Sequence, residues 1–127
     1  MNQRRSSFTG IPSEALQGSK LGLEKEGLRV TRGGRIAQSR HPLKLGSALT
    51  HPSITTDFSE AQLELITPPG ASAREALANL ADTESFVHRN LGDELVWPAS
   101  MPCRLERDDE IPIACYGRSE DGMTKHV

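Results

Sequence analysis

The alternation of apolar and polar residues predicts a β-hairpin at Lys20–Gln38. The run KLGLEKEGLRVT alternates with the period of two that is typical of a strand. Gly33 and Gly34 follow in RGGR, where a tight turn needs residues with positive φ, and RIAQS would be the short returning strand. Residues 40–53 hold two His-Pro pairs and show no period, so we expect an ordered loop there.

The segment Ile54–Pro69, ITTDFSEAQLELITPP, begins and ends with strand-forming residues but has an ambiguous centre. A helical turn would place Asp57, Glu60 and Glu64 on one face, because they are spaced by three and four positions. A strand would instead place Glu64 on one face of a sheet together with Gln62. The spacing alone leaves both structures open.

The clearest predicted element is a helix that begins near Ser72 and ends near Gly92. Ser72 and Glu75 fit a capping box, and the glycine suits the C-terminal end. Five apolar residues fall near one helical face: Leu77, Leu80, Ala81, Val87 and Leu91. Residues 93–105 then indicate an extended segment, and IPIACYG one more short strand. We expect no closing element in the tail, RSEDGMTKHV.

Two carboxylates stand out in the first predicted strand. Glu24 and Glu26 would share one face, about 7 Å apart at their backbones. Burial of these two like charges without a partner would cost several kcal/mol for each carboxylate. A divalent cation such as Mg²⁺ would remove that penalty, because hard cations take carboxylate oxygens as ligands. The alternative is that both acids lie in water on an edge strand, and the E-x-E spacing does not decide between the two.

Composition narrows the class of protein. The 127 residues suit one domain, with residues 1–18 as a loose polar arm and residues 19–127 as the folded part. The formal charge of −2 and the lack of a basic run argue against a nucleic-acid partner. No apolar stretch approaches the roughly 18 residues of a membrane helix, and the polar start is unlike a signal peptide. We therefore expect a cytoplasmic chain in which Cys103 and Cys115 are reduced thiols.

Three long stretches carry a resemblance to a known family. They are GLEKEGLRVTRGGRIAQSRHPLKLGSALTHPSITTDFSEAQLELITPP, HRNLGDELVWPASMPC and YGRSEDGMTK. The chain from about residue 20 onward closely resembles the amino-terminal part of the bacterial glutamate–cysteine ligases, and LGSALTHPSITTDF and WPASMPC are long and specific. The same module also opens a bifunctional enzyme that makes glutathione in one chain, and TDFSEAQLELITPP fits that relative as well.

The resemblance implies a reaction and a site. Family members use ATP to join the side-chain carboxylate of L-glutamate to the amine of L-cysteine through a γ-glutamyl phosphate, the first step of glutathione synthesis. Magnesium ions neutralise charge on the phosphates. Carried over by position, the magnesium ligands are Glu24, Glu26, Asp57 and Glu64. Phe58 corresponds to an apolar wall of the cysteine side-chain pocket, whereas Glu60 receives no ligand role and no residue is assigned as catalytic.

The resemblance also implies a fold. We expect an α+β chain, a partial glutamine-synthetase-like antiparallel sheet with one main covering helix, incomplete at its C-terminus. The family's enzymes are far longer, so residues 19–127 would be the amino-terminal part of a ligase catalytic domain and inactive alone. Two other hypotheses stay open: a non-catalytic remnant or binding module, and the first module of the bifunctional enzyme.

Overall fold

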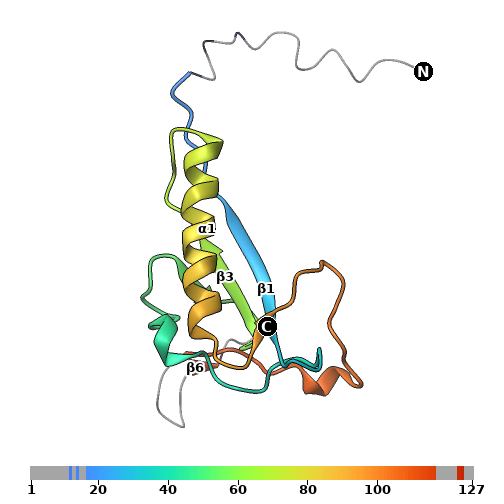
Figure 1. Cartoon of the computed structure of the whole chain (residues 1–127). Coiled ribbons are helices and arrows are strands. Elements are labelled where there is room, and N and C mark those ends of the chain that lie inside the picture. Colours follow the sequence, from blue (N-terminus) through green and yellow to red (C-terminus); the bar gives the residue numbers. More distant parts are fainter. Residues whose placement is uncertain (1–11, 13, 15–16, 117–122, 125–127) are drawn as a thin grey trace, which may run out of the picture.

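The computed structural model describes Pro12, Glu14, residues 17–116 and residues 123–124. A four-stranded antiparallel sheet has the order β2-β3-β1-β4, and a second sheet joins β5 to β6. The elements are β1 (Glu24–Val30), β2 (Ile54–Thr56), β3 (Gln62–Ile66), α1 (Ala73–Asn90), β4 (Leu95–Val96), β5 (Cys115–Tyr116) and β6 (Met123–Thr124), with short 3₁₀ turns at Leu43–Leu45 and Asp108–Glu110. Helix α1 covers one face of the sheet (Figure 1). This arrangement confirms the α+β prediction of an antiparallel sheet with one main covering helix.

The turn after β1 forms as predicted, but the returning strand does not. Gly34 has a φ of 77°, and its N–H donates to the carbonyl of Thr31 at 2.9 Å, whereas Gly33 keeps a negative-φ or extended backbone. Beyond the turn only Ile36 bridges back to Val30. The segment RIAQS does run back beside the end of β1, with the N–H of Ala37 donating to the carbonyl of Arg29 at 2.9 Å. It is too short to count as a strand, and β1 forms its ladders with β3 and β4.

The ambiguous segment Ile54–Pro69 is a second hairpin. β2 and β3 pair antiparallel, with residues 57–61 as the connection. Along β3 the leucines are buried and the alternate residues are half-buried. This alternation excludes the helical interpretation of the centre and confirms that Glu64 shares a face with Gln62.

Helix α1 begins with a capping arrangement close to the predicted one. Ser72 Oγ accepts a hydrogen bond from the N–H of Glu75 at 3.2 Å. The carboxylate of Glu75 reaches back to the N–H of Ala71 at 2.8 Å, one residue before the capping serine. Gly92, with a φ of 70°, follows the end of the helix.

The buried face of α1 differs in part from the predicted face. Val87 and Leu91 are buried, and Leu80 packs against the same core. Leu77 is 60% exposed and Ala81 is also exposed, so both were wrongly placed on that face. Ala76 is buried instead, because the helix is rotated so that this small side chain faces the sheet.

Two apolar clusters form the core. The first lies between α1 and the sheet and contains Leu45, Ile54, Leu63, Leu65, Val87 and Leu91. The second lies near the turn after β1 and contains Val30, Ile36, Ala37, Ala61 and Cys103, with Trp97 packed against it. No helix in the described part of the chain is long and apolar enough to cross a membrane.

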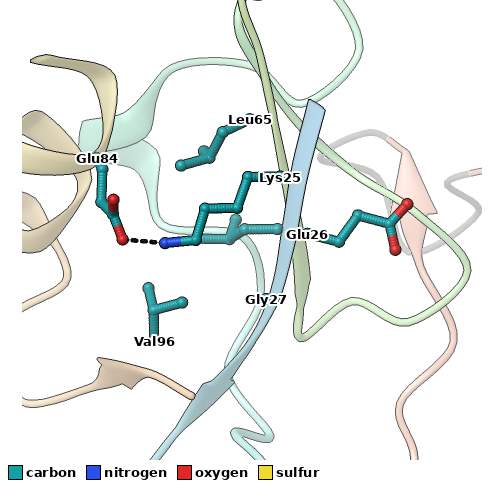
Figure 2. A pocket seen from close by; sticks show the side chains of 7 residues that line it. Lys25, Glu26, Gly27, Leu65, Glu84 and Val96 are labelled. Carbon is teal, nitrogen blue, oxygen red and sulfur yellow. Dashed lines mark hydrogen bonds and ion pairs between the residues drawn. The ribbon is translucent and has the colours of Figure 1, made fainter. Parts of the chain in front are cut away.

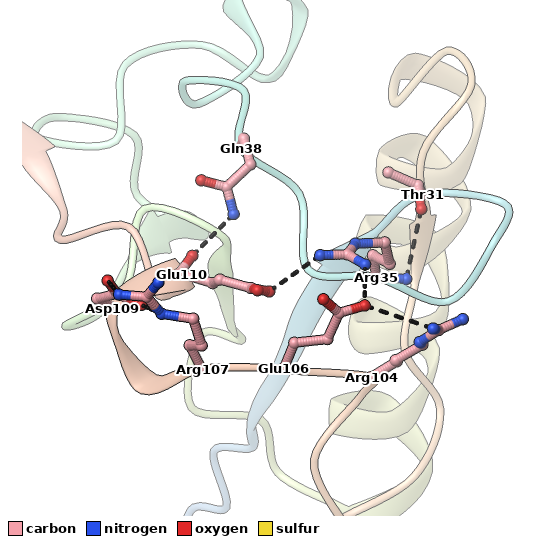
Figure 3. A network of polar contacts seen from close by, with 8 residues as sticks. All are labelled: Thr31, Arg35, Gln38, Arg104, Glu106, Arg107, Asp109 and Glu110. Atoms are coloured by element: carbon pink, nitrogen blue, oxygen red, sulfur yellow. Dashed lines mark hydrogen bonds and ion pairs between the residues drawn. The ribbon is translucent and has the colours of Figure 1, made fainter.

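A polar network ties the segment after β4 to the turn that follows β1 (Figure 3). Arg35 pairs with Glu106 at 2.6 Å and with Glu110 at 3.3 Å. The hydrogen bond between Arg35 and Glu106 raises the pKa of the guanidinium and lowers the pKa of the carboxyl. Residues 93–105 contain β4 but also bends at residues 99–101, so the expected extended segment is met in part, and β5 forms where IPIACYG predicted a strand. β6 was not anticipated, and most of the predicted loose arm and of the tail lies outside the described residues.

Candidate functional site

The pairing of β1 with β3 brings three of the predicted acids onto one face of the sheet. Glu26 lies directly opposite Glu64, and Glu24 lies opposite Ile66. This face is turned away from α1: Figure 2 shows Lys25 reaching toward Glu84 of the helix while Glu26 leaves β1 on the other side. The shared face of Glu24 and Glu26 follows from their spacing, but the presence of Glu64 beside them follows only from strand pairing.

The fourth predicted ligand, Asp57, comes from the loop that joins β2 to β3. Its N–H donates to the carbonyl of Gln62 at 3.2 Å, which extends the β2–β3 pairing by one position. By strand alternation Asp57 belongs to the face that carries Thr55, and Thr55 is the residue paired with Glu64. Phe58 follows directly and its side chain is 52% exposed. The four predicted ligands therefore occupy one side of the sheet, and the exposed Phe58 follows Asp57 directly in the loop.

The donor chemistry of this face fits magnesium. Gln62 lies in the same patch and its Nε2 donates to Glu26 Oε2 at 2.5 Å. No three histidine, cysteine or acidic side chains among the described residues lie close enough to hold a metal ion by themselves. Mg²⁺ does not need such a cage, since it is usually bound by one or two carboxylates together with substrate phosphates and water. Glu26 and Glu64, paired across the β1–β3 ladder, could supply such a partial set.

The opposite face of the sheet is closed against α1. Lys25 forms an ion pair with Glu84, and the hydrogen bond from the lysine lowers the pKa of that carboxyl. A cavity of about 10 Å³ lies here, room for one water molecule at most. It is lined by Lys25, Glu26, Gly27, Leu63, Leu65, Glu84 and Val96. This face of the sheet therefore serves to pack against α1. The acids of β1 and β3 lie on the other face.

Arg29 is a charged residue whose structural role the sequence did not reveal. It is fully buried, and its guanidinium donates to Glu94 Oε2 and Ser39 Oγ, both at 2.6 Å. It also donates to the carbonyl of Glu60 at 2.9 Å. In the sequence, the alternation of β1 only indicates that Arg29 shares a face with Lys25, which faces α1. That alternation does not distinguish a buried arginine from an exposed one.

Glu60 is the second buried charged residue that the sequence left unexplained. Its carboxylate accepts hydrogen bonds from the backbone N–H groups of His41 at 2.8 Å and Cys115 at 2.7 Å. Glu60 is only 5% exposed, and both of its carboxylate oxygens are taken up by these backbone donors. The structure gives this residue contacts within the protein, and its exclusion from the ligand set stays a prediction.

Within the described part of the chain, the cysteines and histidines form no second cluster that could hold a metal ion. Cys103 is buried and Cys115 half-buried, and both are free thiols. Burial raises the pKa of the Cys103 thiol, which disfavours the reactive thiolate. His88 is exposed on α1, and its Nε2 lies 3.7 Å from Glu84 Oε1. His126 lies outside the described residues.

The family model and the similar sequences point to the same protein family. The family model of glutamate-cysteine ligase matches residues 9–127. The chain is 52% identical over 112 residues to a glutamate–cysteine ligase of Saccharophagus degradans, covering 88% of this chain and 21% of that protein. It is 50% identical over 124 residues to one of Pseudomonas putida, covering 98% and 24%. The chain spans about a fifth to a quarter of the length of these relatives.

Solved structures resemble the fold as well. A glutamate–cysteine ligase of Francisella tularensis, solved in complex with AMP, is similar with a TM-score of 0.73 and 44% identity over 80% of this chain and 20% of that one. A bifunctional glutathione synthetase of Pasteurella multocida has a TM-score of 0.73 and 41% identity, covering 78% and 14%. With a family model that matches nearly all of its residues, this chain belongs to the glutamate–cysteine ligase family.

Proposed function

We propose that this chain forms the amino-terminal part of an ATP- and magnesium-dependent ligase that joins the γ-carboxylate of L-glutamate to L-cysteine, the first step of glutathione synthesis. The observation that carries the proposal is the facing pair of Glu26 and Glu64 on the exposed side of the sheet, in a chain of this family. The AMP complex of the Francisella tularensis ligase supports an adenine nucleotide as co-substrate. We place the enzyme in the cytoplasm.

The residues of the sheet would hold the metal ion. Glu24, Glu26 and Glu64 stand on two strands whose ladder fixes their spacing, and Asp57 adds a carboxylate from the adjoining loop. Bound Mg²⁺ supplies charge neutralisation for the phosphates of ATP and for the γ-glutamyl phosphate. The strands supply rigidity, because carboxylates on a hydrogen-bonded sheet need little reorganisation when the charge moves.

Phe58 supplies the other part of the proposed site. Its half-exposed ring follows Asp57 directly, so an apolar surface adjoins the carboxylates. Such a surface suits the small, weakly polar side chain of cysteine while the amine is directed toward the activated carboxyl. The chain itself thus orients the metal and one side of the acceptor, and glutamate and the nucleotide base would be bound by other segments of the enzyme.

Activity measurements test this proposal at two levels. The purified 127-residue chain, given Mg²⁺, ATP, glutamate and cysteine, should release no phosphate, and measurable turnover would contradict the need for further segments. In the complete ligase that carries this segment, Glu24→Gln and Glu64→Gln should each lower turnover by about 100-fold or more. Glu75→Gln, at a carboxylate that caps α1, is the matched control and should stay near wild type. Near-normal activity in both site variants would refute the ligand assignment.

Two other functions remain to be separated from this one. The similarity to the Pasteurella multocida enzyme favours a bifunctional synthetase as the second candidate. Addition of glycine distinguishes them, since a bifunctional enzyme would release glutathione and a ligase only γ-glutamylcysteine. A native protein with an intact mass of 13.9 kDa and no turnover would instead support a non-catalytic remnant or binding module.

A further inference from the structure

The carboxylate of Glu60 joins three distant segments of the chain. Oε1 accepts from the N–H of His41 at 2.8 Å, and Oε2 accepts from the N–H of Cys115 at 2.7 Å. These donors lie 19 and 55 residues away in sequence. Backbone N–H bonds to a carboxylate are charge-assisted and short, and they are about twice as strong as neutral ones. Both oxygens of this buried acid are thereby occupied by backbone donors.

The backbone around Glu60 is held by the same neighbours. The N–H of Glu60 donates to the carbonyl of Pro112 at 2.8 Å, and the N–H of Ala114 donates to the carbonyl of Phe58 at 2.9 Å. The carbonyl of Glu60 accepts from Arg29 Nη2 at 2.9 Å. The loop of residues 57–61 is therefore clamped between the segment that leads into β5 and the end of β1.

This clamped loop is the part of the proposed site that lies outside the β1–β3 ladder. Glu24, Glu26 and Glu64 belong to the β1–β3 ladder, whereas Asp57 and Phe58 lie beyond the end of β2. We propose that Glu60 is a positioning residue that fixes the loop of residues 57–61 and so the places of Asp57 and Phe58. This inference rests on the proposed function, since it assigns those two residues to the metal and to the acceptor pocket.

The proposal explains why a carboxylate, rather than an amide, occupies this position. A glutamine has one acceptor oxygen and one NH₂ group, so Glu60→Gln keeps one backbone bond and turns a donor toward the other N–H. A buried donor left without an acceptor is unfavourable and pushes the segments apart. Residues that orient metal ligands and substrate contacts in this way commonly change metal affinity or activity by about 10–100-fold when they are mutated.

Amide hydrogen exchange on the 127-residue chain tests the positioning without any activity. In the wild type, the amides of His41 and Cys115 should be as protected as those of the β1–β3 ladder. Glu60→Gln should raise exchange about tenfold or more at one or both, and should shift the amide resonances of Asp57 and Phe58. Glu75→Gln, the same change at another backbone-bonded carboxylate, should leave these four amides unchanged. Fast wild-type exchange at both donors would overturn the proposal even if the variant did not fold.

Kinetics of the complete ligase separate a positioning role from a general loss of stability. Glu60→Gln should raise the KM for cysteine and the Mg²⁺ concentration for half-maximal rate by about tenfold, with a smaller change in kcat. Unchanged values of both would overturn the positioning role while the ligase function stood. A wild-type ligase without activity would refute the proposed function, and the exchange experiment would still decide the role of Glu60.

Discussion

Glu26 of β1 and Glu64 of β3 lie directly opposite each other in an antiparallel pair, with like charges on the same face of the sheet. Like charges at directly opposite positions destabilise a sheet. An apolar pair at these two positions would make the sheet more stable, so stability does not account for the two acids. In the proposed function, a bound cation would offset this repulsion. The pairing of two acids is thus a stability cost that the proposed metal site would explain.

Removal of one charge of the pair should stabilise the metal-free chain. Glu26→Gln keeps an oxygen that can accept from Gln62 but removes the repulsion with Glu64, so we expect a gain of about 0.2–1 kcal/mol in the free energy of unfolding. Urea denaturation at low ionic strength measures it, and added salt should shrink the gain. Glu24→Gln is the control because Glu24 faces Ile66, and an equal gain there would contradict the pairwise explanation.

Gly27 should tolerate no side chain while Val96 is present. A Cβ at position 27 would lie 2.6 Å from Val96 Cγ1, in the contact between β1 and β4. We expect Gly27→Ala to lower the free energy of unfolding by about 1–3 kcal/mol. The second substitution Val96→Ala should recover part of that loss, as a double-mutant cycle would show. Gly33→Ala, whose new Cβ would meet nothing closer than 3.7 Å, is the matched control.

The buried guanidinium of Arg29 should be essential for stability. Arg29→Met would leave Glu94 without its ion pair and the carbonyl of Glu60 without its donor, so we expect a loss of about 3–5 kcal/mol. Chemical denaturation followed by circular dichroism measures this loss. Arg32→Met is the control, because Arg32 is 70% exposed and lies 3.9 Å from Asp93. Similar losses in the free energy of unfolding of the two variants would contradict the view that the buried ion pair of Arg29 stabilises the fold more than an exposed one does.

His41 should make stability depend on pH in the weakly acidic range. Burial is the main cause that lowers its pKa below 6.5, with Arg29 and His51 acting in the same direction and Glu60 opposing them. The folded state then favours the neutral ring, and its contribution is complete above about pH 6.5 and is lost as pH falls toward the lower folded pKa.

The variant His41→Phe tests this dependence. Both ring nitrogens of His41 are buried without a hydrogen-bond partner in the described structure, so an aromatic ring without them should cost little at neutral pH. We expect its thermal midpoint to fall less than that of the wild type between about pH 8 and about pH 5. Parallel melting profiles of the two proteins would show that His41 does not titrate with unfolding.

Elements with a local signal were predictable from the sequence. The capping serine of α1 and the glycine after its end follow from short-range backbone chemistry. The first strand and the shared face of Glu24 and Glu26 follow from the period of two. The rotation of α1 was not predictable, since Ala76 and Leu77 are neighbours and only packing against the sheet decides which of them is buried.

By itself, the sequence determined the family, the covering helix and the spacing of the acids along each strand, because these depend on neighbouring residues and on a shared ancestry. The position of Glu64 opposite Glu26, and the hydrogen bonds that Glu60 accepts from segments 19 and 55 residues away, came to light in the folded chain alone. Strand pairing and buried hydrogen bonds join residues whose separation in sequence carries no local pattern, and the packing of the whole sheet selects the partners.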